Sequence, residues 1–184
     1  MDIFEKCYQR YIQDEVREQG VYPYFRALES RQDTEVIMEG KRRIMLGSNN
    51  YLGLTTNSSV IEAGVQAYRT LGSGCSGSRF LNGTLELHLE LEDELAKFLR
   101  KDAVVTFSTG FQSNLGIISS IVGLHDYVIM DRENHASLYD GCKLSYGKML
   151  RYQHNDMADL EKKLQKVPDT AGCLIVTDGV FSMG

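Results

Sequence analysis

Two periodicities alternate along the second part of the chain. Short apolar runs rich in β-branched residues are separated by segments that repeat apolar residues at helical spacing. The predicted strands cover residues 103–107, 127–130, 148–152 and 173–176, and the predicted helices cover residues 111–122, 137–144 and 156–166. Strands that alternate with helices indicate βαβ units and a mostly parallel sheet with helices on both faces.

The first part of the chain reads differently. Residues 2–19 place apolar side chains at helical spacing, and the runs 35–38 and 42–46 flank a short turn. We therefore predict a helical arm and a small β-hairpin within residues 1–48, ahead of an α/β domain that starts at residue 49. A capping box at 59–62 predicts the start of a helix.

Residues 85–100 allow two readings. Leucines alternate there as in a strand, but the Glu-rich composition and the unbroken length favour a helix. At the other end, the strand 173–176 is followed by a polar turn and no closing helix. Because a parallel sheet needs both faces covered, we expect a truncated α/β domain over residues 49–184.

Composition and charge exclude several classes of function. A net charge of -5 leaves no basic face for nucleic acid. No apolar run approaches the ~20 residues that span a bilayer, so no transmembrane segment is predicted. The four cysteines and four histidines are scattered, which argues against disulfides and against a metal site. We expect reduced thiols in a cytoplasmic protein.

Polar residues follow two of the predicted strands. His135 comes just after the strand 127–130, and Asp178 and Ser182 come after the strand 173–176. Open α/β sheets bind ligands outside the carboxyl ends of their strands, so a binding role for His135 is favoured over that of a surface histidine. For Asp178 and Ser182, a ligand contact and a plain turn after the strand are equally good readings.

A third strand end opens directly into a helix. The first N–H groups of a helix lack partners and carry partial positive charge, and Gly110 permits close approach. The backbone of Gly110 and Phe111 is therefore a candidate phosphate seat, whereas the alternative is an ordinary helix cap by Ser108 or Thr109.

The loop 72–77 matches the GxGxxG pattern of dinucleotide-binding proteins. It follows a predicted helix instead of a strand, so we reject nicotinamide binding. The loop is interpreted as a flexible Gly/Ser segment that either lines a site or contacts another subunit.

Together these motifs resemble one family. They are the segments 49–54, 72–79, 83–88, 110–111, 134–137, 154–156 and 178–183. In this order and spacing they are similar to the α-oxoamine synthases, which are pyridoxal-phosphate (PLP) enzymes with an aspartate-aminotransferase-like fold. The resemblance implies a three-layer αβα architecture, the large domain of PLP-dependent transferase fold type I.

The resemblance also implies roles for individual residues. Gly110 and Phe111 would hold the cofactor phosphate, and His135 would stack on the pyridine ring as the catalytic histidine. Ser182 would lie near the phenolic oxygen of the cofactor, and Asp178 would support that corner.

Two further residues have implied substrate roles. Asn49 matches a family asparagine that meets the amino-acid substrate, and Arg26 falls near a substrate-side arginine. The Schiff-base lysine of the family matches no lysine of this chain, so we expect it, with the Asp that pairs with the pyridinium nitrogen, beyond residue 184. The 184-residue chain alone is expected to be inactive.

The family reaction joins an amino acid to an acyl-CoA with loss of CO2. The segments 72–84 and 22–26 most resemble bacterial members that use L-serine and a long-chain acyl-CoA and form a 3-keto sphingoid base. The alternatives within the family are 2-amino-3-ketobutyrate CoA ligase (glycine C-acetyltransferase) and 8-amino-7-oxononanoate synthase. A non-catalytic homologue that binds acyl-CoA or a partner subunit is a further alternative. The resemblance also implies a homodimer with shared active sites.

Overall fold

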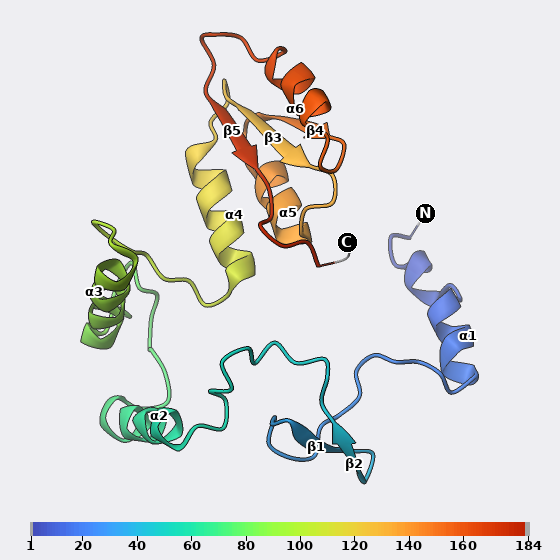
Figure 1. Cartoon of the computed structure of the whole chain (residues 1–184), viewed down its shortest axis with the longest axis vertical. Coiled ribbons are helices and arrows are strands. Elements are labelled where there is room, and N and C mark those ends of the chain that lie inside the picture. Colours follow the sequence, from blue (N-terminus) through green and yellow to red (C-terminus); the bar gives the residue numbers. More distant parts are fainter. Residues whose placement is uncertain (1, 183–184) are drawn as a thin grey trace. The chain divides into compact units, whose positions relative to one another are not determined.

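The computed structural model of the chain describes residues 2–182. The chain divides into two compact units, Met1–Ser76 and Gly77–Gly184 (Figure 1). This division falls later than the predicted start of the α/β domain at residue 49, and that predicted boundary stays a prediction. Met183, the last residue of the family-like segment after the final strand, lies outside the described residues.

The first unit holds an N-terminal arm, a hairpin and a helix. The elements are η1 (Glu5–Tyr8), α1 (Ile12–Glu18), β1 (Glu35–Met38), β2 (Lys41–Ile44) and α2 (Ser58–Leu71). The continuous helix predicted for residues 2–19 is wrong, because Gln9 adopts an extended conformation and separates η1 from α1. The predicted hairpin is confirmed: β1 and β2 pair antiparallel around Glu39 and Gly40, which both have positive φ, as a tight hairpin turn requires.

Helix α2 is capped two residues earlier than the predicted capping box. Its cap is Asn57, whose Oδ1 accepts hydrogen bonds from the N–H groups of Ser59 at 3.0 Å and Val60 at 3.3 Å. The prediction of Ser59 as the cap is therefore wrong, because Asn57, two residues upstream, caps the helix and leaves Ser59 inside its first turn.

The second unit is an α/β assembly. Its elements are α3 (Glu86–Leu99), α4 (Gly110–Ile121), β3 (Tyr127–Asp131), α5 (Ala136–Leu144), β4 (Lys148–Tyr152), α6 (Met157–Leu164) and β5 (Cys173–Val176). The strands lie in the order β4-β3-β5, and both pairings are parallel. The predicted βαβ architecture is confirmed, as is the helix predicted for residues 85–100.

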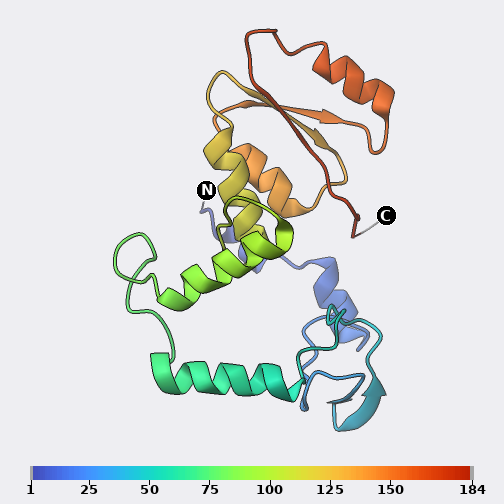
Figure 2. The same ribbon diagram turned by 60° about the vertical axis from the view of Figure 1, so that its left-hand side comes forward.

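Helices cover both faces of this sheet. Figure 2 shows α6 on the side of the sheet opposite α4 and α5. On the α4 and α5 side, β3 contributes Val128 and Met130 to a core with Ile118 and Cys142. Gly141 allows α4 and α5 to approach closely, because a Cβ at this position would lie 2.9 Å from the carbonyl oxygen of Asn114. This packing holds the start of α4 beside the start of α5.

The strand predicted for residues 103–107 does not form. The segment has no regular secondary structure and pairs with no strand in the part of the chain that the structure describes. The N–H group of Thr106 donates instead to Oε1 of Glu92 at 2.9 Å, so a side chain of α3 takes the place of a neighbouring strand. Across residues 2–182 no helix has both the length and the apolar character needed to cross a membrane.

Candidate functional site

The carboxyl end of β3 leads directly into the first turn of α5. His135 is the N-cap of this helix, and its Nδ1 accepts a hydrogen bond from the N–H of Ser137 at 3.2 Å. An imidazole in a capping position is held close to the backbone, and the local sequence therefore fixes where His135 lies. His135 is exposed to solvent at this edge of the sheet.

One asparagine side chain ties the end of β3 to the end of β5. The Nδ2 of Asn134 donates to the carbonyl oxygen of Val176 at 2.9 Å, and its Oδ1 accepts from the N–H of Asp178 at 3.0 Å. In return, Oδ2 of Asp178 accepts from the N–H of His135 at 2.6 Å. Residues His135 and Asp178 are therefore brought together, as expected for neighbouring parallel strands.

The start of α4 lies next to the same histidine. The rings of Phe111 and His135 are 6.2 Å apart between centroids and meet edge to face at 76°. Thr109 caps the helix by accepting from the N–H of Gln112 at 3.1 Å. The N–H groups of Gly110 and Phe111 have no acceptor among residues 2–182, and a Cβ at Gly110 would meet nothing within 4 Å.

These features give the edge of the sheet a defined chemistry. Two unpaired helix N–H groups at the positive end of α4 suit a phosphate, and an imidazole next to them suits a flat ring. The carboxylate of Asp178 adds an acceptor at the same edge. The donor set therefore fits a phosphorylated heteroaromatic cofactor better than a metal ion. Among residues 2–182, no three His, Cys, Asp or Glu side chains form a metal-binding cluster.

A buried carboxylate anchors the adjoining turn. Asp131 is 2% exposed and accepts hydrogen bonds from the N–H groups of Glu133 and Asn155 and from Nδ1 of His154. Burial raises the pKa of Asp131, but these hydrogen bonds outweigh burial and bring the pKa below its ordinary value. Asp131 is therefore an ionised anchor at the end of β3.

Phe181 packs against His154, the histidine that is hydrogen-bonded to Asp131. Its ring meets that of His154 edge to face, with centroids 4.5 Å apart. Ser182, the next residue along the chain, is exposed. The contact thus joins the segment that carries Ser182 to the turn after β4.

Asn49 and Arg26 belong to the first unit. Asn49 lines a hollow of about 480 Å³ together with Gln32 and Tyr51. Arg26 lies 3.7 Å from Oε1 of Glu39 in a partly exposed ion pair.

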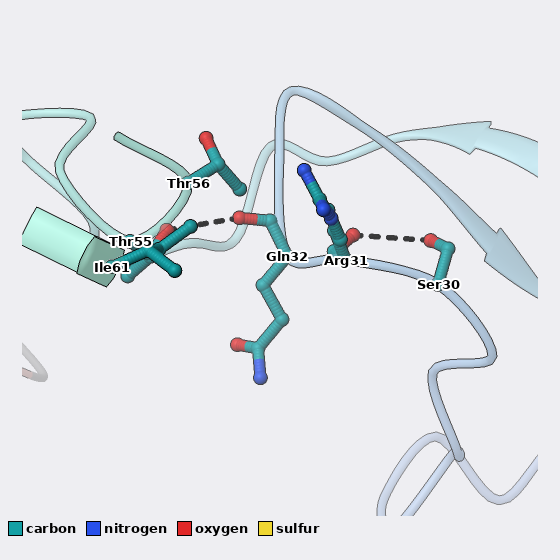
Figure 3. Close-up of a pocket in the computed structure, with 6 residues that line it drawn as sticks. All are labelled: Ser30, Arg31, Gln32, Thr55, Thr56 and Ile61. Carbon is teal, nitrogen blue, oxygen red and sulfur yellow. Dashed lines mark hydrogen bonds between the residues drawn. The ribbon is translucent and has the colours of Figure 1, made fainter. Parts of the chain in front are cut away.

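A second hollow of about 310 Å³ lies beside Gln32, shown in Figure 3. It is lined by Ser30, Arg31, Gln32, Thr55, Thr56 and Ile61. Thr55 Oγ1 donates to the carbonyl oxygen of Gln32 at 3.0 Å, which holds these two segments of the first unit together.

Sequence reasoning did not assign roles to several residues at the strand edge. Asn134 and His154 lie in motifs that pointed to the family and Asp131 lies outside them, but the hydrogen bonds of all three join segments more than 20 residues apart. Asn114 and Ser137 were given no role of their own, although Asn114 Nδ2 donates to Ser137 Oγ at 2.9 Å. The one available signal was the position of Asn134 directly before the candidate histidine.

Known proteins resemble this chain over most of its length. Residues 41–184 match the family model described as aminotransferase class I and II. A serine palmitoyltransferase of Sphingobacterium spiritivorum is 53% identical over 172 residues, which are 94% of this chain and 43% of that protein. An 8-amino-7-oxononanoate synthase of Geobacter sulfurreducens is 46% identical over 92% of this chain and 43% of its own length.

Solved structures agree with the fold. A variant serine palmitoyltransferase from S. paucimobilis, solved with a bound adduct of PLP and myriocin, matches with a TM-score of 0.92 and 38% identity. The match covers 100% of this chain and 47% of that one. The α-oxoamine synthase resemblance and the PLP-transferase fold are therefore confirmed. The chain spans less than half the length of these relatives.

Proposed function

The chain belongs to the aminotransferase class I and II family, and from this premise we propose that the complete protein is a PLP-dependent acyltransferase. The proposed reaction condenses L-serine with a long-chain acyl-CoA to a 3-keto sphingoid base, CoA and CO2, a step of sphingolipid synthesis. The observation that carries this proposal is the meeting of Phe111 and His135, with unpaired N–H groups at Gly110 and Phe111.

The start of α4 supports the phosphate site. A phosphate placed there would accept from the N–H groups of Gly110 and Phe111 and would face the positive end of a helix of 12 residues. The open space at Gly110 leaves room for phosphate oxygens close to the backbone. Each such charge-assisted hydrogen bond contributes about 1.5–3 kcal/mol.

The strand edge supports the ring site. In the proposal His135 stacks on the pyridine ring and acts as the catalytic histidine. Asp178 fixes the backbone of His135 through its hydrogen bond of 2.6 Å and supports the same corner. Ser182 supplies a hydroxyl near the phenolic oxygen. PLP, when bound, acts as an electron sink for a substrate carbanion, while the residues of the chain bind and orient it.

Substrate contacts are proposed for the first unit. We assign Asn49 to the amino-acid substrate, since its side chain lines an open hollow with polar neighbours. We assign Arg26 to the substrate side, where its guanidinium would exchange the exposed carboxylate of Glu39 for that of a substrate. Both assignments come from the family resemblance, and neither residue is needed for the cofactor proposal.

The choice of substrate rests on the relatives. The preference for L-serine and a long-chain thioester follows the serine palmitoyltransferase of S. spiritivorum, which is more similar to this chain than the oxononanoate synthase of G. sulfurreducens. An 8-amino-7-oxononanoate synthase or a glycine C-acetyltransferase remains the alternative enzyme. A non-catalytic homologue that binds acyl-CoA or a partner subunit is the alternative from another class.

Two measurements on the complete protein test the proposal. PLP should bind and give visible absorbance, and CoA should be released from palmitoyl-CoA only when L-serine is present. Release with alanine or glycine but not serine would favour another member of the family. A protein that stays colourless with added PLP would contradict the proposal, and PLP binding without turnover of any amino acid would favour the non-catalytic homologue.

A pair of substitutions tests the proposed phosphate-binding site at the start of α4. Gly110 is the first residue of α4 and Thr109 before it is extended, so proline fits at 110 without breaking the helix. Gly110→Pro removes one N–H donor and should weaken PLP binding by roughly ten- to a hundredfold. Gly110→Ala keeps the donor but adds a Cβ to the open space, so it separates the loss of room from the loss of the N–H group. Unchanged affinity in the proline variant would place the phosphate elsewhere.

We also propose that the complete protein is a cytoplasmic homodimer with active sites shared between subunits. Support comes from the resemblance and from the Gly/Ser loop at 72–77 and the N-terminal arm, which are candidate subunit contacts. Sedimentation of the complete protein at working concentration tests the dimer, and a monomer would contradict it.

A further inference from the structure

A buried hydroxyl connects the candidate histidine to a neighbouring helix. Ser137, in the first turn of α5, is 1% exposed. Its Oγ lies 2.7 Å from Nδ1 of His135 and 2.9 Å from Nδ2 of Asn114 on α4. A buried hydroxyl that leaves its hydrogen or its lone pairs unused is costly, so both contacts are expected to be hydrogen bonds of defined direction.

The chemistry of Asn114 and His135, which lie on either side of the Ser137 hydroxyl, sets the direction of the two hydrogen bonds. The Nδ2 of Asn114 can only donate, so Oγ of Ser137 accepts from it. The hydroxyl hydrogen of Ser137 is then left for His135. The backbone N–H of Ser137 also points at Nδ1 of His135, at 3.2 Å. Both protein groups that face Nδ1 therefore offer it a hydrogen.

An imidazole nitrogen that receives two hydrogens must be unprotonated. The proton of the neutral ring then lies on Nε2. A hydrogen on Nδ1 would face two other hydrogens and would also remove the cap of α5, whose first turn depends on this nitrogen as its acceptor.

We propose that Asn114 and Ser137 are positioning residues that hold His135 as the Nε2–H tautomer in one fixed orientation. This inference rests on the proposed function, because the tautomer and orientation of the His135 imidazole matter when that ring stacks on the bound cofactor. It adds two residues to the site that never touch the cofactor and act only through His135. Close packing of α4 on α5 at Gly141 keeps Asn114 within reach of Ser137.

The tautomer can be measured on the complete protein without cofactor. Long-range 1H–15N spectra of histidine-labelled protein distinguish protonated from bare ring nitrogens, and His135→Gln identifies the signals of His135 by their loss. We expect a bare Nδ1 and a protonated Nε2 in the wild-type protein. A wild-type protein with its proton on Nδ1 would overturn the proposal.

Two substitutions give readouts that a general loss of structure would not produce. Ser137→Ala removes one of the two donors to Nδ1, and a mixture of tautomers is expected. Asn114→Asp keeps the shape but supplies an acceptor, which turns the hydroxyl hydrogen of Ser137 away from His135 and should shift the population toward Nδ1–H. Ser119→Ala, which removes another α4 hydroxyl bonded to the Leu115 carbonyl, is the control and should leave the signals unchanged.

Binding of PLP supplies the second readout. Ser137→Ala should weaken PLP binding by roughly three- to tenfold, the effect of one lost hydrogen bond. His135 signals that do not move in either folded variant would overturn the proposal, and circular dichroism identifies a variant that fails to fold. A wild-type protein that does not bind PLP refutes the proposed function instead, since the tautomer is determined without cofactor.

Discussion

The Nδ1 atom of His154 lies 3.0 Å from Oδ1 of Asp131, at the point where β3 ends. The same carboxylate accepts the backbone N–H groups of Glu133 at 2.9 Å and Asn155 at 3.2 Å. One buried acidic group therefore organises both the turn that leads to His135 and the turn that follows β4.

Replacing Asp131 with Asn should lower the free energy of unfolding by about 3 kcal/mol, because an amide leaves one of the buried donors without an acceptor. The effect should depend on pH. Because the folded pKa of Asp131 is below its ordinary value of 3.8, the carboxylate stabilises the fold fully above that value. This stability is lost as the pH falls through the lowered pKa.

Urea unfolding of the complete protein at a series of acidic and neutral pH values measures this effect. The Asp131→Asn variant should lose part of the pH dependence of the wild-type protein. The exposed Asp169→Asn variant is the matched control and should behave like wild type. An Asp131→Asn protein with wild-type stability at neutral pH would contradict the anchoring role.

Gly141→Ala should destabilise the protein by about 1–3 kcal/mol. The new Cβ would lie 2.9 Å from the carbonyl oxygen of Asn114 and 3.1 Å from Cδ1 of Ile118, so α4 and α5 must move apart. Gly64→Ala in α2 is the control, since nothing lies within 4 Å there and the same change should stabilise that helix by roughly 0.5–1 kcal/mol. Thermal unfolding compares the two; equal shifts would mean that close packing at Gly141 is unimportant.

Glu92→Gln should lower the urea midpoint of unfolding. The guanidinium of Arg79 donates to both oxygens of Glu92, at 2.5 and 3.0 Å, and Thr106 adds two more hydrogen bonds. Hydrogen bonds from Arg79 first, and from Thr106 next, lower the pKa of Glu92 to about 2. The carboxylate therefore stabilises the fold above its ordinary pKa of 4.5, and this contribution is lost only as the pH falls through about 2.

The exposed Glu90→Gln on the same helix is the matched control and should leave the midpoint unchanged. If Glu92→Gln and Glu90→Gln gave the same midpoints over the whole pH series, the Arg79 network would have no role in stability.

Cys142 should resist alkylation in the folded protein. Its side chain is 1% exposed, and burial raises the pKa of the thiol from 9.0 to about 11. Below pH 9 the reactive thiolate is then roughly a hundredfold scarcer than for an ordinary cysteine, before access is considered. Iodoacetamide labelling followed by peptide mass spectrometry, with and without urea, measures this. Fast labelling of Cys142 without urea would show that α5 opens readily.

Much of the α/β unit could be predicted from local pattern. The bounds of β4 and β5 agree with the predicted strands, because short runs rich in apolar residues between turn residues are sufficient to define strands. The segment 103–107 has the same composition but forms no strand, because a strand also requires a neighbour, which local pattern does not reveal. Instead, Thr106 bonds to Glu92.

The site was predictable only in its local parts. His135 and the pair Gly110 and Phe111 follow strand and helix signals, and the structure brings them to one edge. The contacts of Ser137 with Asn114 depend on how two helices pack, which the periodicity of each helix does not specify. Helix packing therefore supplies the supporting residues, while sequence pattern supplies those expected to meet the ligand.

The amide of Asn134 continues the sheet after its backbone pairing has ended. The β3–β5 register stops at Met130 and Val176, and beyond that point the side chains of Asn134 and Asp178 join the two segments in place of backbone pairing. The spacing of the two strand ends thus depends on two side chains instead of on backbone hydrogen bonds. A point substitution at Asn134 should therefore shift Asp178 relative to His135 while the strand pairing beneath them stays intact.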